Sequence, residues 1–239
     1  MDSGVLPAKF NGTSYCLPLI VPRISPLMNS CKVTPRRLPN PPRTALAHLR
    51  KVDPALAPII DRWGVPELPG RSVTLGAICG DIIGQQLSVR VADVIRGRFF
   101  ALPGVGEDPA PDSIFAITDE TLRAAGLSRA KIAAVRDLAR FWGEHNLAHE
   151  QLAGMPDEDL IELLTQVRGI GPWTVKMILI FSLRRPDVLP FEDLGLRMGL
   201  QKVDGLAERP TPKQVIARAE IWAPYRSLGT WYCWQSLRK

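Results

Sequence analysis

A short segment with two glycines, VRGIGPWTV at positions 167–175, has the residue types and spacing that most clearly point to a chemical role. Glycine supplies the positive φ angles that so tight a turn needs, and Pro172 suits the first turn of a following helix. Such a turn leaves the amide N–H groups of Gly169 and Gly171 uncovered, and the helix dipole adds partial positive charge. The segment therefore predicts an anion site, for which a nucleic-acid phosphate is a natural ligand. An ordinary helical hairpin without a ligand is the alternative.

The cysteines and the charges exclude several other kinds of site. Cys16, Cys31, Cys79 and Cys233 are scattered, with no CxxC pair and no His/Cys cluster, so we expect reduced thiols, no metal and no cofactor. The formal net charge is +6, but residues 1–51 hold eight basic groups and one acid, and the rest hold 22 basic and 23 acidic groups. Any nucleic-acid surface must therefore be local.

The elements that must position the glycine segment are helices. Residues 1–43 contain eight prolines and several basic groups, which predicts a disordered tail. From Thr44 onward the apolar residues recur at helical spacing, and no alternating run is long enough to demand a sheet. The sequence predicts an all-α protein of about ten helices. No apolar run approaches the roughly 18 residues of a membrane span, so no membrane partner is expected.

Eight of these helices can be placed by their apolar period, and Ser88 and Thr211 stand where helix N-caps are expected. The expected ranges are 73–83, 88–100, 130–142, 157–164, 172–183, 193–203, 212–222 and 225–237.

Four segments, in this order along the chain, resemble motifs of the helix-hairpin-helix DNA glycosylase superfamily, and of its 3-methyladenine DNA glycosylase II type in particular. They are IIGQQLS at 82–88, LTQVRGIGPWTVK at 164–176, LPFEDLGLR at 189–197 and WAPYRSLGTWYCW at 222–234. The resemblance covers roughly residues 44–237 and implies a two-lobed helical fold with an active-site cleft between the lobes. The central lobe would be residues 75–183, and the flanking lobe would join 44–74 to 184–239.

The resemblance also implies a chemistry for Asp193. Enzymes of this family flip a damaged purine out of the duplex and cleave its N-glycosidic bond, which gives the sugar oxocarbenium character. Asp193 matches the position of the family's catalytic aspartate, so it is expected to stabilise the sugar and to orient or deprotonate the attacking water. An aspartate before an apolar run is also a common helix N-cap, which is the alternative. The neighbouring Glu192 is expected to be solvated.

Trp173 separates two branches of the superfamily. Bifunctional members place a Schiff-base lysine just after the hairpin, at LPGVGxK, whereas this chain reads VRGIGPW. Lys176 lies about a turn further round the helix and is not expected to substitute. The chain also lacks the four-cysteine cluster of the endonuclease III and adenine-mismatch branches. The resemblance therefore implies monofunctional hydrolysis, which leaves an abasic site in an uncut strand.

Aromatic residues are the expected walls of a base pocket. Alkylation at N3 or N7 gives a purine a positive charge, which aromatic faces attract by about 0.5–2 kcal/mol. Motif position implies a pocket formed by Trp234, Trp173, Met177, Phe191 and Tyr225. A place in the hydrophobic core is the alternative for each of them.

The DNA contacts implied by the resemblance come from two turns. They are expected from Arg168, Gly169, Ile170, Gly171 and Thr174 of the hairpin and from Gln86 and Leu87 of the GQQLS turn. Relatives insert a wedge from this second turn, and Gln86 stands where a leucine can occur, so which of the two residues intercalates stays open. A plain turn between helices is the alternative.

Taken together, these features predict a DNA glycosylase of base excision repair that hydrolyses alkylated purines, of the 3-methyladenine and 7-methylguanine type, from double-stranded DNA. We expect an intracellular monomer, in a bacterial cytoplasm or a eukaryotic nucleus. One alternative is a non-catalytic helix-hairpin-helix DNA-binding protein, which needs neither Asp193 nor an aromatic cleft. The other is a glycosylase for a neutral lesion base, which needs side chains that hydrogen-bond to base edges.

Overall fold

The computed structural model describes residues 43–66, 68 and 70–238, and the regular elements within these ranges are all helices. The predicted all-α class is confirmed for this part of the chain. The predicted disordered tail lies outside the described residues, except for Arg43, which begins the first helix. None of the described helices is both long and apolar enough to cross a membrane.

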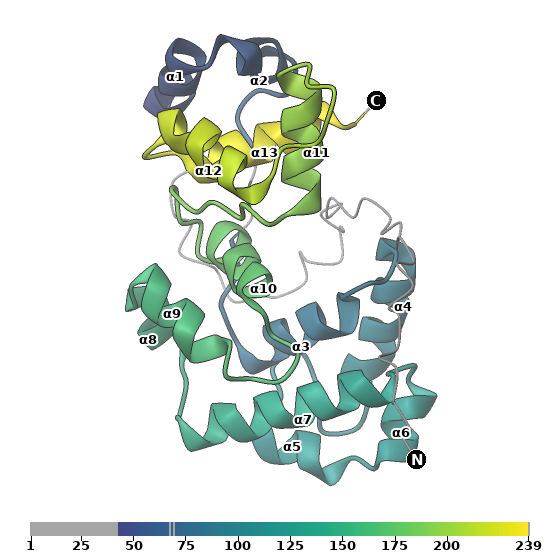
Figure 1. The fold of residues 1–239 in the computed structure, drawn as a ribbon. Coiled ribbons are helices and arrows are strands. Elements are labelled where there is room, and N and C mark those ends of the chain that lie inside the picture. The colour runs from purple at the N-terminus through teal and green to yellow at the C-terminus, as the bar shows by residue number, and fades with distance from the viewer. Residues whose placement is uncertain (1–42, 67, 69, 239) are drawn as a thin grey trace, which may run out of the picture.

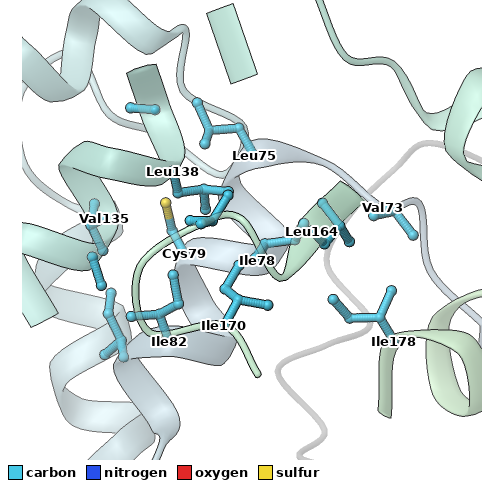
Figure 2. Close-up of a cluster of buried hydrophobic side chains, with 14 of the residues drawn as sticks. Val73, Leu75, Ile78, Cys79, Ile82, Val135, Leu138, Leu164, Ile170 and Ile178 are labelled. Carbon is cyan, nitrogen blue, oxygen red and sulfur yellow. The ribbon is translucent and has the colours of Figure 1, made fainter. Parts of the chain in front are cut away.

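A first group of helices lies at one end of the molecule (Figure 1). It consists of α3 (Leu75–Gly84), α4 (Val89–Phe100), α5 (Pro111–Ala116), α6 (Asp119–Ala124), α7 (Arg129–Glu144), α8 (His149–Gly154) and α9 (Asp157–Leu164). Its core includes Ile78 and Ile82 of α3 together with Val135 and Leu138 of α7 (Figure 2). Burial of these side chains is the main stabilising contribution, since each fully buried aliphatic side chain is worth about 1.5–3 kcal/mol.

A second group lies at the opposite end and contains both ends of the described chain (Figure 1). It consists of α1 (Arg43–Val52), a 3-10 turn η2 (Pro54–Leu56), α2 (Ala57–Trp63), α11 (Leu194–Val203), α12 (Pro212–Ala219), a 3-10 turn η4 (Glu220–Trp222) and α13 (Arg226–Ser236). Its own buried cluster is built around Leu49, Leu200, Trp222 and Tyr232. Burial raises the pKa of Tyr232 to about 12, so its hydroxyl stays protonated and donates to the Gly64 carbonyl.

Helix α10 (Pro172–Met177) and the π-helical turn η3 (Ile178–Ser182) lie between the two groups (Figure 1). Trp234 of α13 belongs to the first core, and the side chain of Trp231 packs against both cores. The glycine hairpin and the start of α11 are therefore close to the place where the two groups meet.

The eight helices placed by their apolar period are present, with changes at their ends. The predicted caps are found: the side chain of Ser88 accepts the Val91 amide, and Thr211 forms a reciprocal capping box with Gln214. The range 172–183 is not one continuous α-helix, because the hydrogen bonding changes to π-helical at Ile178. Short helices such as α5, α6 and α8 were not placed, because six residues are too few to show a period.

Candidate active site

The hairpin that joins α9 to α10 depends on one glycine and one buried isoleucine. Gly169 has a φ of 81°, a backbone conformation that residues with side chains rarely adopt. A Cβ at this position would also lie 3.1 Å from the Cβ of Ala134 on α7. The side chain of Ile170 is 4% exposed and lies within the first core (Figure 2). Gly169 therefore allows the turn, and Ile170 anchors it.

Helix α7 also holds the hairpin through a carboxylate. The amide of Arg168 donates to Oδ2 of Asp137 at 2.7 Å. This hydrogen bond, together with one from the Arg140 guanidinium, lowers the pKa of Asp137 below its ordinary value. The carboxylate is therefore ionised near neutral pH and pairs with one of the hairpin's N–H groups.

Some backbone N–H groups of the hairpin already donate hydrogen bonds within the protein. The Arg168 amide is taken by α7, and the Ile170 amide donates to the Val167 carbonyl at 3.1 Å. The amides of Gly169 and Gly171 have no acceptor within the described ranges. These two N–H groups, at the tip of the hairpin, are the ones that remain for an external anion.

Replacing Gly169 by Ala tests this geometry. We expect the variant to lose about 1–3 kcal/mol of unfolding free energy, because a Cβ is strained at positive φ and presses on Ala134. Urea denaturation measures this loss. Gly97→Ala is the matched control: Gly97 lies inside α4 with open space around its Cβ position, so alanine there is expected to stabilise by about 0.5–1 kcal/mol. Equal stability of Gly169→Ala and the unmodified protein would refute the strained turn.

Asp193 is the N-cap of α11 and is at the same time bonded to two tryptophans. Its Oδ1 accepts the Leu196 amide at 2.6 Å and Nε1 of Trp234 at 2.8 Å, and its Oδ2 accepts Nε1 of Trp173 at 2.8 Å. Asp193 is therefore a helix N-cap, as the alternative interpretation predicts. However, a simple cap needs no indole donors, and these two connect the carboxylate to the hairpin helix and to α13.

The oxygen Oδ2 is the more available of the two in Asp193. A carboxylate can accept about four hydrogen bonds, and three are accounted for, two of them on Oδ1. The remaining position belongs to Oδ2, whose donor Trp173 is 41% exposed. Asp193 is itself half-buried, so the carboxylate is neither remote from the hairpin nor sealed inside the protein.

Glu192 is 35% exposed, but it is not the free solvated residue that the sequence predicts, because it is ion-paired. Both of its carboxylate oxygens lie 2.8 Å from Nζ of Lys176, which is 8% exposed and 4.0 Å from the ring centroid of Phe191. The expectation was wrong because Lys176 comes from α10 and reaches the segment before α11. This ion pair joins the hairpin helix to the segment that carries Asp193.

The aromatic residues expected around a base pocket are only partly brought together. Trp234 is buried and stacks on Phe181 of η3, with ring centroids 5.6 Å apart and an interplanar angle of 19°. Met177 packs against the first core, whereas the ring of Tyr225 lies edge-on to His48 of α1, 5.5 Å away. Phe181 is a residue that the sequence pattern does not single out, because its stacking on Trp234 joins η3 to the distant helix α13.

The turn between α3 and α4 presents Gln86. This residue is exposed and has a φ of 57°, while Leu87 is half-buried and its amide donates to the Gly84 carbonyl. Thr174, expected to contact DNA, is 7% exposed, and its Oγ1 lies 3.4 Å from Nε2 of the Gln85 side chain. Thr174 therefore shapes the hairpin more than it offers a surface.

Two hollows that the structure describes lie away from Asp193. One, of about 210 Å³, lies between α11 and α12. The other, of about 280 Å³, lies beside the hairpin and is lined by Phe115, Ala133, Arg136, Asp137, Arg140 and Arg168. Asp193 lines neither of them, so an open cleft between two lobes stays a prediction.

The regular elements of the described residues are all helices, and a glycine hairpin joins two of them. The second helix of the hairpin contacts Asp193 at the start of the next helix. This is the arrangement of a helix-hairpin-helix protein. The family model described as HhH-GPD superfamily base excision DNA repair protein matches residues 79–224, which include the hairpin and Asp193. The chain belongs to this superfamily.

Relatives and solved structures agree with this assignment. DNA-3-methyladenine glycosylase 1 of Schizosaccharomyces pombe is 38% identical over 156 residues, which cover 65% of this chain and 68% of the relative. Putative DNA-3-methyladenine glycosylase YfjP of Bacillus subtilis is 34% identical over 161 residues, which cover 65% of this chain and little more than half, 56%, of that relative. The structure of S. pombe 3-methyladenine DNA glycosylase (Mag1) in complex with abasic DNA has a TM-score of 0.72 and 33% identity, and covers 80% of this chain and 95% of that one.

Proposed function

We propose that this protein is a monofunctional DNA glycosylase that hydrolyses the N-glycosidic bond of alkylated purines in double-stranded DNA and leaves an abasic site. The observation that carries the proposal is the Asp193 carboxylate, held by the indole N–H groups of Trp173 and Trp234 next to the hairpin. The 3-methyladenine glycosylase names of the relatives support the substrate class. The protein would act as a monomer inside the cell.

Asp193 would act on the sugar. When the bond between C1′ and the base nitrogen breaks, the bonding electron pair leaves with the purine, and the sugar becomes an oxocarbenium ion that a fixed negative charge stabilises. Water then adds through its oxygen to C1′. Because Oδ1 already accepts two N–H groups, Oδ2 is the oxygen that would face the sugar and orient the water or receive its proton.

The aromatic groups near Asp193 suit a cationic base. An alkylated purine already carries a positive charge and leaves as a neutral molecule, so little help from a general acid is needed. Trp173, and the stacked pair of Trp234 and Phe181, would offer faces that attract such a cation by about 0.5–2 kcal/mol. Met177 and Phe191 would line the base of this pocket. Tyr225 contributes less, because its ring is engaged by His48.

The residues at positions 173 and 176 support hydrolysis without strand cutting. Trp173 stands where bifunctional relatives have their nucleophilic amine, and Lys176 is paired with Glu192. No Schiff base with the abasic sugar would form at either position, and so the strand would stay intact.

The hairpin and the turn before α4 would hold the DNA. The Gly169 and Gly171 amides, with the exposed Arg168 beside them, suit a backbone phosphate, which is bound without reading sequence. Ile170 and Thr174 would act by shaping the turn. Of the two candidate wedge residues, exposure favours Gln86 over the half-buried Leu87 as the one that fills the gap left by the flipped base.

Incubation of the unmodified protein with methylated duplex DNA tests this function. We expect chromatography to detect free methylated purines, and the strand to break only after alkali treatment. A parallel duplex with deaminated, neutral bases should release no comparable amount. DNA binding without base release would instead indicate a non-catalytic binder, release restricted to neutral bases a different lesion class, and direct strand breaks a bifunctional enzyme.

A further inference from the structure

The turn from Gln85 to Leu87 is held from two sides by groups outside its own backbone. On one side, Nζ of Lys131 from α7 donates to the carbonyls of Ile83 at 2.7 Å and Gln85 at 3.0 Å. A cation at the C-terminus of α3 also complements the helix dipole. Burial and the nearby Arg96 lower the pKa of Lys131 below its ordinary value.

On the other side, the turn is bonded to the glycine hairpin. Nε2 of the Gln85 side chain donates to the Gly169 carbonyl at 3.0 Å and lies 3.4 Å from Oγ1 of Thr174. One side chain therefore contacts the turn of the hairpin at Gly169 and its second helix at Thr174, 84 and 89 residues further along the chain. The tip of the hairpin and the turn are thus joined by a direct hydrogen bond.

Gln86, which follows, has a backbone conformation that needs such support. A φ of 57° is unfavourable for a residue with a side chain by about 1–2 kcal/mol. Strain of this kind persists when the surroundings fix the backbone. Here the surroundings are Lys131, which holds the carbonyl of Gln85, and the hairpin, which holds its side chain.

We propose that Gln85 and Lys131 are positioning residues that lock the turn to the hairpin, so that Gln86 enters the duplex in register with the phosphate bound at Gly169 and Gly171. The inference rests on the proposed function. If the lock is broken, the turn must be ordered during each flipping event, and extrusion of a paired base slows. An unpaired base needs little extrusion, so its release is largely unaffected.

Four variants separate this role from a general effect on folding or charge. Gln85→Glu keeps the shape but removes the donor and places a carboxylate against the Gly169 carbonyl. Gln166→Glu is its matched control, because this substitution adds the same charge beside the hairpin. The side-chain amide of Gln166 donates to the Glu162 carbonyl of the preceding helix α9, not to the turn. Lys131→Met removes the ammonium group and keeps the stem, and Lys131→Arg restores a cation.

The readout is the ratio of two single-turnover rates of base release, one for a methylated purine in a paired duplex and one for the same base opposite a gap. The ratio is taken within one preparation, so it does not depend on the folded fraction. We expect Gln85→Glu and Lys131→Met to lower it about tenfold, the effect of losing roughly one hydrogen bond's positioning energy, and both controls to stay within about threefold of the unmodified protein.

Two outcomes would overturn the inference, and they differ from each other. An unchanged ratio in Gln85→Glu and Lys131→Met, or an equal change in Gln166→Glu, would refute the lock while the proposed function stands. Absence of base release from both substrates by the unmodified protein would refute the proposed function and the lock together.

Discussion

Replacing Asp193 by Asn is expected to lower the rate of methylpurine release by about 10²–10⁴-fold, the largest functional effect of any substitution in this protein. The change removes the negative charge that would stabilise the oxocarbenium ion. It keeps an oxygen that accepts the Leu196 amide, and asparagine caps helices about as well as aspartate does. What it cannot keep is a second acceptor for Trp173. Single-turnover release of labelled base measures the effect.

The control for this variant is Asp61→Asn. Asp61 is an exposed carboxylate on α2 that pairs with Arg50 at the surface, and its loss is expected to change neither the rate nor the stability by much. DNA affinity should be similar in both variants, because the hairpin is untouched. If Asp193→Asn retains a tenth or more of the original rate, this carboxylate does not act on the sugar.

Replacing Glu192 by Gln is expected to give the largest loss of stability among single changes near the site, about 2–3 kcal/mol of unfolding free energy. The reason is that the buried Lys176 side chain loses the counter-charge of its ammonium group, and the face of Phe191 is a weak substitute. Urea denaturation at neutral pH measures the change. Base release should also fall, because the ion pair holds the segment before Asp193 against α10.

Two further variants show whether the loss of stability in Glu192→Gln comes from the unpaired Lys176 charge. Glu144→Gln removes an ion pair with Arg140 in which both side chains are about half exposed, so we expect little or no loss of stability. Adding Lys176→Met to Glu192→Gln removes the unpaired charge, and part of the lost stability should return. If the Glu192→Gln protein is as stable as the Glu144→Gln protein, the Lys176–Glu192 ion pair does not stabilise the fold.

The sequence predicts the parts of this site that depend on local chain geometry. The hairpin follows from the glycine spacing, and the position of Asp193 at a helix start follows from the apolar run after it. That Trp173 and Trp234 would lie near the same carboxylate was implied only by the resemblance to known motifs, because no local rule brings residue 234 to residue 193. Both indoles donate to it.

The contacts that the sequence could not predict join residues distant along the chain. Glu192 has the residue type of a solvated side chain, and only the approach of α10 makes it the ion-pair partner of the buried Lys176. Gln85 has the residue type of a polar turn position, and its bond to Gly169 exists because α3 and the hairpin both pack against α7. The stacking of Phe181 on Trp234 joins η3 to α13, which no local pattern in the sequence predicts.

The affinity for a charged abasic-site analogue measures most directly whether a fixed anion lies beneath the sugar. Duplex DNA carrying a pyrrolidine ring, which is cationic, is compared with duplex DNA carrying a neutral tetrahydrofuran ring of the same shape. We predict that the unmodified protein binds the cationic analogue at least about tenfold more tightly, and that Asp193→Asn binds the two equally. The same preference in both proteins, or no preference in the unmodified one, would contradict the role given to Asp193.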